Sequence, residues 1–443
     1  MEAMTIGFLR EKYLSGSLTP QKLMETILEN AQKLERMNIW IVEPSEKLIK
    51  QYIEKLGPMD FDRKPLWGIP FAIKDNIDLK DVPTTAACPE YSYIPEKSSK
   101  VVEKLVEAGA IPIGKTNLDQ FATGLVGTRS PYGEVHNSLN EELISGGSSS
   151  GSAVAVATGL VTFALGTDTA GSGRVPAALN KLIGYKPSCG LWSLSGVVPA
   201  CASLDCVTVM ATTMEDVTTV SDVVDGYDSE DKWSKKLPLD KETEKKKLIV
   251  PKDEPEFYGD FKYQYQDAWH RTIEEFKEKG FIIEEEDCSF YQEAAALLYG
   301  GPCVAERWSD LGEFVLEHEE DIFPVTRTIL KTGNNDSYTA SYLYKTLHEL
   351  TEYKRRSKVQ LSDAILMLPT CAGTYTRDEV RENPIECNNN MGKYTNHCNL
   401  LDMCAIDVPG VDADENLPFG VTLFAPSGND RVLFKAAKKV LGD

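Results

Sequence analysis

The stretch ISGGSSSGSAVAVATG (144–159) joins a glycine–serine turn directly to an apolar run. Its glycines permit backbone conformations that other residues avoid, and its three consecutive serines, 148 to 150, offer hydroxyl groups and helix N-caps. A flexible linker is rarely followed at once by a run such as AVAVA. A phosphate-binding loop would need GxxxxGKS or GxxxxGKT, or GxGxxG after a strand. The stretch therefore predicts a tight turn that opens a buried helix.

A second glycine–serine turn follows in VTFALGTDTAGSGRVPAA (161–178). A predicted strand, VTFALG, ends in this turn, which Asp168 and Arg174 flank and could hold. A helix and a strand lie between Ser148 and Ser172, which are 24 residues apart, so the two turns can be adjacent in space. Nucleophiles commonly lie on tight turns, where backbone N–H groups point at the reacting oxygen. The paired turns therefore predict a catalytic site.

The rest of the chain alternates predicted strands and helices. Thr19 can cap a helix over 18–35, and Pro20 suits its first position. The other expected elements are strands at 67–78, 110–117, 247–251, 281–286 and 361–370, helices at 99–109 and 262–279, and a largely helical region at 289–360. This alternation favours an α/β architecture around a central sheet. The charge-dense segment 227–247 has almost no apolar periodicity, so we expect an exposed connection between two lobes there.

The composition excludes several classes of partner. The 443 residues include 47 Lys and Arg against 68 Asp and Glu, a formal net charge of −21. Such a surface repels phosphate backbones, so no nucleic-acid partner is expected. No apolar stretch approaches the ~18 residues that would span a membrane. The N-terminal residues lack the apolar core of a signal peptide, so we expect no membrane partner and a cytoplasmic location.

The cysteine and histidine patterns point away from metals. The ten cysteines form no CxxC pair, and the five histidines show neither HxxxH nor HExxH spacing. In a chain without a secretory signal, we expect reduced and mostly buried thiols. We therefore expect no metal and no cofactor.

Three motifs, in the same order and spacing, resemble those of the amidase signature family of serine hydrolases. They are GIPFAIKD (68–75), GGSSSG (146–151) and GTDTAGSGR (166–174). The resemblance runs from about residue 15 to the C-terminus. It implies an amidohydrolase of one amidase domain over 1–443, α/β in class, with a large mixed β-sheet flanked on both faces by α-helices.

The resemblance also implies a Ser–cis-Ser–Lys triad. Ser172 would be the nucleophile, and Ser148, which a cis peptide bond precedes in the family, would connect it to Lys74. The residues themselves agree, because a serine hydroxyl needs a base and a lysine can serve if burial keeps it neutral. Lys74 follows an apolar stretch, and no histidine lies near either serine in the sequence, which argues against a Ser-His-Asp arrangement without excluding it. Taken alone, Lys74 could be a surface lysine paired with Asp75.

An oxyanion hole and two supporting residues follow from the same resemblance. The hole would consist of the backbone N–H groups of four consecutive residues, Thr169, Ala170, Gly171 and Ser172. Many relatives have glycine at the position of Ala170, so the hole is expected to be slightly narrower here. Ser149 and Asp168 are the expected supporting residues.

Further segments resemble allophanate hydrolases in particular, a group within this family. They are TTAACP (84–89), KTNLDQFATGLVGTRSPYG (115–133), GVVPACASLDCV (196–207), LLYGGPCVAER (297–307) and GKYTNHCNLLD (392–402). The resemblance implies removal of the terminal amide nitrogen of allophanate as ammonia, giving N-carboxycarbamate, in urea degradation. The alternatives are another amidase, such as a small-amide amidase or the catalytic subunit of a tRNA-dependent amidotransferase, and a catalytically inactive interaction module.

Allophanate is a small anion, so a chain with net charge −21 needs local cations to bind it. The candidate substrate-binding residues are Tyr299, Arg307, Gly124 and Arg174. In one helix, Tyr299 and Arg307 would share a face, because eight residues are slightly more than two turns. Three alternatives remain open: Arg307 could pair with a neighbouring carboxylate on a helix surface, Tyr299 could be core packing, and Arg174 could only brace its loop through Asp168.

The resemblance carries expectations about partners as well. Full-length allophanate hydrolases have a further C-terminal domain that helps to decarboxylate the product, and this chain ends about where the amidase domain finishes. In fungi the domain is often fused to a biotin-dependent urea carboxylase. Relatives are often homodimers, so we expect a dimer with an interface in the helical region 289–360.

Overall fold

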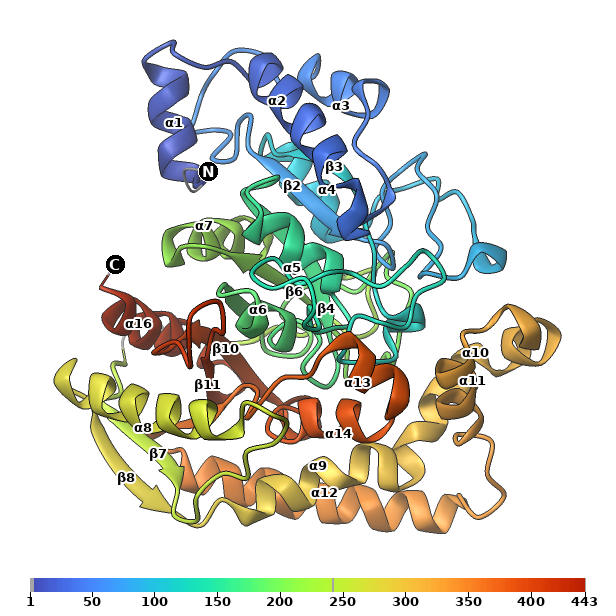
Figure 1. Cartoon of the computed structure of the whole chain (residues 1–443), viewed down its shortest axis with the longest axis vertical. Coiled ribbons are helices and arrows are strands. Elements are labelled where there is room, and N and C mark those ends of the chain that lie inside the picture. The colour runs from blue at the N-terminus through green and yellow to red at the C-terminus, as the bar shows by residue number, and fades with distance from the viewer. Residues whose placement is uncertain (1–3, 241–242, 443) are drawn as a thin grey trace.

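A mixed β-sheet lies at the centre of the protein (Figure 1). The computed structural model describes residues 4–240 and 243–442. In this part of the chain the sheet has 11 strands, in the order β1-β3-β2-β4-β6-β5-β10-β11-β9-β7-β8. Their bounds are β1 Trp40–Val42, β2 Pro70–Lys74, β3 Ile111–Thr116, β4 Phe163–Asp168, β5 Ile183–Lys186, β6 Cys206–Ala211, β7 Lys247–Pro251, β8 Ile282–Glu286, β9 Ala364–Pro369, β10 Met403–Pro409 and β11 Gly420–Pro426. Strand β2 is parallel to β3 and β4, and β7 is parallel to β8 and β9, whereas the other neighbours are antiparallel.

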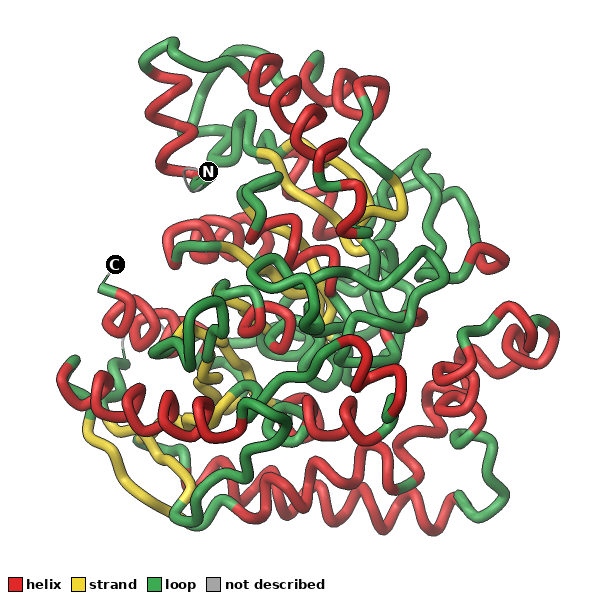
Figure 2. The backbone as a smooth tube through the Cα atoms, in the orientation of Figure 1, coloured by secondary structure: helices red, strands yellow, loops and turns green. Residues whose placement is uncertain are grey.

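Helices surround the sheet (Figure 2). They are α1 Ile6–Leu14, α2 Pro20–Lys33, α3 Glu46–Ile53, α4 Lys100–Glu107, α5 Ser150–Ala157, α6 Val175–Leu179, α7 Met214–Val224, α8 Lys262–Glu278, α9 Ser289–Gly300, α10 Ala305–Glu317, α11 Pro324–Lys331, α12 Ala340–Gln360, α13 Arg377–Glu382, α14 Glu386–Gly392, α15 His397–Leu400 and α16 Asp430–Leu441. Every residue of β2, β3, β4 and β6 is buried, which requires cover on both faces of the sheet. The expected α/β fold is therefore confirmed.

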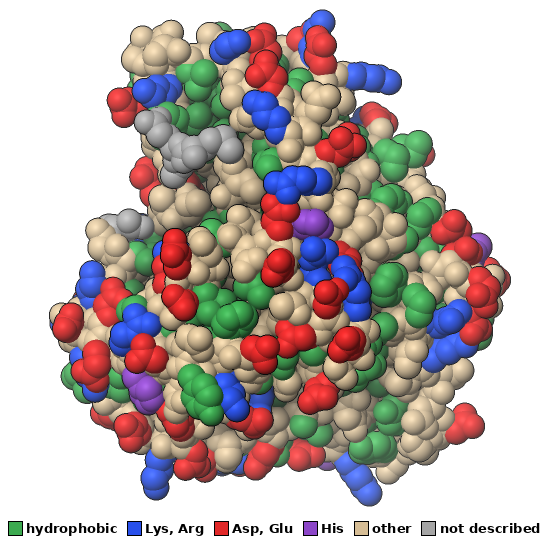
Figure 3. Space-filling view, viewed as in Figure 1, with side chains coloured by type: hydrophobic (Ala, Val, Ile, Leu, Met, Phe, Trp, Pro, Cys, Tyr) green, Lys and Arg blue, Asp and Glu red, His purple; other side chains and the backbone are tan. Residues whose placement is uncertain are grey.

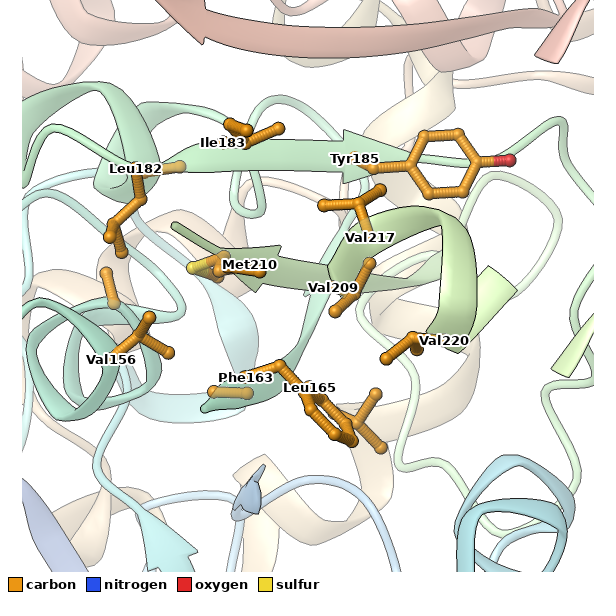
Figure 4. Close-up of a cluster of buried hydrophobic side chains, with 14 of the residues drawn as sticks. Val156, Phe163, Leu165, Leu182, Ile183, Tyr185, Val209, Met210, Val217 and Val220 are labelled. Atoms are coloured by element: carbon orange, nitrogen blue, oxygen red, sulfur yellow. The ribbon is translucent and has the colours of Figure 1, made fainter. Parts of the chain in front are cut away.

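Large side chains of β4, β5 and β6 pack on both faces of the sheet. Figure 4 shows the buried cluster of Phe163, Leu165, Ile183, Tyr185, Val209 and Met210 with Val217 and Val220 of α7. A small residue, glycine, lies where the turn before α5 comes close to β4. A Cβ on Gly166 of β4 would lie only 2.7 Å from Ser149 Oγ. Glycine at this position therefore lets the turn before α5 lie against β4.

The predicted elements are confirmed, with boundaries that differ by a few residues. Helix α2 begins at Pro20, and Thr19 accepts a hydrogen bond from the Lys22 N–H as its cap. Helix α5 begins within the serine run, at Ser150. The region 289–360 is largely helical, and β9 returns to the main sheet as expected.

The polar segment 227–247 includes residues 241–242, which lie outside the described residues. Residues 227–240 contain neither helix nor strand, but they are fastened to the loop at 190–195. Asp228 accepts a hydrogen bond from Ser193 Oγ (2.7 Å), Asp231 accepts one from the Leu194 N–H (2.8 Å), and the Lys235 N–H donates to the Gly190 carbonyl (2.8 Å). The segment is thus partly exposed and held against the molecule.

Candidate active site

Lys74 lies at the carboxyl end of β2, fully buried. Its Nζ donates hydrogen bonds to Ser148 Oγ (2.7 Å) and Thr167 Oγ1 (2.8 Å). The peptide bond between Gly147 and Ser148 is cis. Asp75 instead forms a buried ion pair with Lys115 (3.2 Å). Lys74 is therefore not the surface partner of Asp75, and its amine faces the first glycine–serine turn.

Burial lowers the pKa of Lys74 to about 7, although the charges of Asp119, Asp205 and Asp168 act in the opposite direction. A large fraction of the amines is therefore neutral near neutral pH. A neutral amine can take a proton from the Ser148 hydroxyl, which makes the pair suited to general-base chemistry.

Ser172 lies in the second glycine–serine turn, residues 168–174. Its Oγ lies 3.5 Å from the Gly124 carbonyl oxygen, a long contact, and its own carbonyl accepts a hydrogen bond from the Ser149 N–H (3.3 Å). The two glycine–serine turns therefore meet, as expected. Between the described residues, no hydrogen bond joins Ser172 Oγ to Ser148 Oγ, so the relay requires the Ser172 hydroxyl to turn toward Ser148 when substrate is bound.

Asp168 and Arg174 hold the 168–174 turn together. The guanidinium donates two hydrogen bonds of 2.9 Å to the carboxylate, one from Nε and one from Nη2. The same carboxylate accepts the N–H groups of Gly171 (2.9 Å) and Gly173 (3.1 Å). Burial alone would raise the pKa of Asp168, but the charge and hydrogen bonds of Arg174 outweigh it and lower that pKa. Arg174 is buried in this pairing and braces the loop.

The four N–H groups expected in the oxyanion hole differ in their partners. The N–H of Gly171, one of the four expected donors, is already committed to Asp168. Its neighbours Thr169, Ala170 and Ser172 have no acceptor for their N–H groups among the described residues, so these three are available to a reacting oxygen. The side chain of Thr169 donates to Asp205, and Asp205 also accepts the Ala200 N–H (2.8 Å). These bonds fix the position of the Thr169 backbone.

Tyr299 and Arg307 meet, but for a different reason than expected. They do not share one helix, because α9 ends at Gly300 and α10 begins at Ala305, with a Gly301–Pro302 break between them. The break brings the guanidinium over the ring of Tyr299, 5.4 Å from its centre, and Nη2 lies 3.1 Å from the phenol oxygen. Arg307 is buried and has no carboxylate partner within ion-pair distance in the described chain, and neighbouring Glu306 binds Ser203 instead.

Arg307 and Ser172 are connected through two consecutive residues. Arg307 Nη1 donates to Thr123 Oγ1 (2.9 Å), and the next residue, Gly124, places its carbonyl beside Ser172 Oγ. Asp119 holds this loop by accepting the N–H groups of residues 126, 127 and 129. The buried Arg307 guanidinium is therefore linked to the Ser172 hydroxyl through Thr123 and Gly124, and the charge of Asp205 acts on it from beyond ion-pair distance.

Most of the chain matches one family of known proteins. The family model described as Amidase matches residues 22–434. The chain belongs to the amidase family. It is 40% identical over 438 residues to the urea amidolyase of Saccharomyces cerevisiae, covering 96% of this chain and 23% of that protein. It superposes on the allophanate hydrolase of Kluyveromyces lactis with a TM-score of 0.90, 37% identity and coverage of 99% of this chain and 72% of that one. It is also 36% identical over 294 residues to a glutamyl-tRNA(Gln) amidotransferase subunit of Lactobacillus acidophilus, over 63% of this chain and 58% of that protein.

The sequence hypotheses for this amidase omitted several residues that the site contains. Ser149 was expected, and its hydroxyl bonds to the Thr167 carbonyl (3.2 Å). Thr167, Asp119, Asp205 and Thr395 were not expected. Thr395 donates to the Ala170 carbonyl (2.7 Å). Asp119, Asp205 and Thr395 lie inside the segments that resemble allophanate hydrolases, so those segments carried a signal, although it could not say what each residue touches.

Neither a metal-binding cluster nor a membrane span is present in this amidase within residues 4–240 and 243–442. No group of three or more His, Cys, Asp and Glu side chains is arranged to hold a metal ion in these residues. In the same part of the chain, no helix is both long and apolar enough to cross a bilayer.

Proposed function

We propose that this amidase hydrolyses allophanate, releasing the terminal amide nitrogen as ammonia and leaving N-carboxycarbamate. The observation that carries the proposal is Arg307. No carboxylate of the described residues lies within ion-pair distance of this buried guanidinium, which is linked to the Ser172 region through Thr123 and Gly124. A small substrate with a carboxylate at one end and an amide at the other would fit both groups. The similarity to the urea amidolyase and allophanate hydrolase supports the same substrate.

The proposed reaction uses the amine of Lys74 as the base. Neutral Lys74 takes a proton from Ser148, which takes one from Ser172, and Ser172 attacks the terminal amide carbonyl. The tetrahedral oxyanion is held by the N–H groups of Thr169, Ala170 and Ser172. The relay then runs backwards and protonates the departing ammonia. Water cleaves the acyl-enzyme, and the serine is restored.

Alternative amidase substrates fit less well. The amidotransferase relative matches only 63% of this chain, whereas the allophanate hydrolase superposes over 99%. A neutral amide would offer no charge to the buried Arg307 guanidinium, whereas a carboxylate would form a charge-assisted hydrogen bond with it. An inactive interaction module would not require a buried lysine with its pKa lowered to about 7 beside a serine.

Larger assemblies are also part of the proposal. The chain spans about a quarter of the curated urea amidolyases that it matches. We expect this unit to work in the cytoplasm with a C-terminal decarboxylation domain and a urea carboxylase, fused or associated, and to form a homodimer through the helical region 289–360.

The decisive experiment measures ammonia release from allophanate, malonamate and biuret side by side. We expect allophanate to be the best substrate, and we expect Ser172→Ala to lose at least ~1,000-fold in rate while circular dichroism shows an intact fold. A fluorophosphonate adduct on Ser172, located by mass spectrometry, would separate an active hydrolase from an interaction module. Retention of more than a few per cent of activity in Ser172→Ala would reject the nucleophile, and preference for biuret would reject the substrate.

A further inference from the structure

Three side chains cluster beneath the 168–174 turn and have no part in the proposed reaction. Lys186 ends β5, Cys206 begins β6, and Cys189 lies in the loop after β5. The two sulfur atoms are 3.6 Å apart, and Lys186 Nζ lies 3.4 Å from the sulfur of Cys206 and 4.0 Å from that of Cys189. Both thiols are free.

The charge of Lys186 makes this cluster unusual. The side chain is fully buried, and among the described residues no carboxylate lies within ion-pair distance of it, although the charge of Asp168 acts on it from farther away. Its Nζ donates to the Pro187 carbonyl (2.7 Å), which supplies a dipole but no charge. A buried ammonium requires a counter-charge, and the adjacent sulfur atoms can supply one as a thiolate.

Cys189 is the thiol suited to that role. The hydrogen bond from Cys206 and the charge of Lys186 together lower the pKa of Cys189 to about 6, against the effect of burial. The pKa of Cys206 is raised in turn. A thiolate beside a protonated thiol is the arrangement in which one sulfur reacts and the other resolves.

We propose that Cys189 and Cys206 form a peroxide-sensitive thiol pair that closes reversibly to a disulfide. The Cys189 thiolate attacks one oxygen of a hydroperoxide, the O–O bond breaks, and Cys189 becomes a sulfenic acid. The other oxygen leaves as hydroxide or alkoxide and takes a proton from solvent to give water or an alcohol. The Cys206 thiol then attacks that sulfur, the S–S bond forms, and water leaves. The sulfurs lose two electrons and the peroxide gains them. The sulfur atoms need to approach by only about 1.5 Å.

Cys189 lies close to the polar segment 227–240. The side chain is 6% exposed, and the ion pair between Lys235 and Asp402 (3.4 Å), whose side chains are partly exposed, lies within electrostatic reach of its sulfur. Lys235 belongs to segment 227–240, and its N–H donates to the carbonyl of Gly190, the residue after Cys189 (2.8 Å).

Formation of the Cys189–Cys206 disulfide would affect the active site through the backbone. Cys206 is the register partner of Asp168 in the antiparallel ladder of β4 and β6. The Cys189 sulfur lies 3.8 Å from the Leu204 carbonyl, which accepts a hydrogen bond from Asn399 Nδ2 (2.7 Å), and the same amide donates to the Asp168 carbonyl (2.8 Å). Residues 204–206 also include Asp205, the partner of Thr169. We therefore expect oxidation to displace the 168–174 turn and lower the turnover number.

The test treats the whole chain with hydrogen peroxide, blocks the remaining thiols with N-ethylmaleimide after denaturation, and maps the peptides by mass spectrometry. We expect a linked pair of peptides containing Cys189 and Cys206, with a loss of two hydrogens, that dithiothreitol separates. We also expect kcat for ammonia release to fall on the order of tenfold and to recover with dithiothreitol. The peptide map does not depend on the substrate, so it stands even if the proposed function fails.

Two variants distinguish oxidation of this thiol pair from oxidation of other cysteines. Cys189→Ala should give no link and keep its activity after peroxide, whereas Cys404→Ala, which removes a buried thiol bonded to the Ala425 carbonyl, should behave as the wild type. Full alkylation of both thiols after peroxide, or a link from Cys206 to Lys186 in place of Cys189, would overturn the proposal. Equal loss of activity in Cys189→Ala and the wild type would do so as well.

Discussion

Lys74 combines complete burial with a pKa lowered to about 7, and this titration predicts a pH dependence. Below that pKa the amine is protonated and cannot accept a proton from Ser148. Above it the amine is neutral and can act as the base. We therefore expect kcat/KM to rise about tenfold per pH unit below neutrality and to level off above it, in a pH profile of ammonia release.

The matched control for this profile is Asp205, because burial raises its pKa to about 6. If Lys74 sets the profile, Asp205→Asn should keep the rising limb but move it to lower pH, because the charge of Asp205 raises the pKa of Lys74. If Asp205 sets it, the limb should disappear. A flat profile between about pH 6 and pH 9 would contradict a neutral-lysine base.

Arg307 predicts a different kinetic signature. A hydrogen bond to a charged group contributes roughly 1.5–3 kcal/mol, so Arg307→Ala should raise KM for allophanate between about 10-fold and 100-fold. Tyr299→Phe, which keeps the ring under the guanidinium and loses one hydroxyl, should raise it only severalfold. Steady-state kinetics with allophanate and malonamide would check both, and equal effects on the anionic and the neutral substrate would reject a carboxylate contact.

At the level of elements, the 168–174 turn depends on a glycine that no side chain can replace. Gly171 has φ +135°, and a Cβ there would lie 2.3 Å from Thr395 Oγ1. We expect Gly171→Ala to lower the free energy of unfolding by about 1–3 kcal/mol and activity by at least ~100-fold, measured by urea unfolding and ammonia release.

Gly57 supplies the control for that prediction. It also has a positive φ, +68°, but a Cβ there would meet nothing within 4 Å. Gly57→Ala should therefore cost about 1 kcal/mol in backbone strain and leave activity unchanged. Equal activity in the two variants would show that the contact with Thr395 does not position the turn.

At the level of the whole molecule, the net charge of −21 opposes an anionic substrate. Acidic side chains are spread over the face shown in Figure 3, with basic ones between them. Because salt screens repulsion between distant charges, we expect kcat/KM for allophanate to rise about twofold between about 0.01 M and 0.15 M salt. Biuret, which is neutral, is the control and should not respond. A fall with salt would show that local cations attract the substrate before it enters.

Much of this protein follows from sequence alone, because the deciding patterns are local. The turn before α5, the cap at Thr19 and the run of buried strands each depend on residues a few positions apart, and the GIPFAIKD, GGSSSG and GTDTAGSGR motifs indicate the family. Sequence also predicted that Ser148 and Lys74 belong to one site.

Only the tertiary structure shows which distant residues contact one another in the site. Lys74 could have paired with Asp75, and only the folded chain shows Asp75 bound to Lys115 and the amine of Lys74 buried against Ser148. The Gly301–Pro302 break brings Arg307 to Tyr299 by a route that a continuous helix would not take. The contacts of Asp205 with Thr169 and of Cys189 with Cys206 join segments that share no sequence periodicity. The physical reason is that burial and charge balance are sums over all neighbours, and those neighbours are defined only when the sheet is assembled.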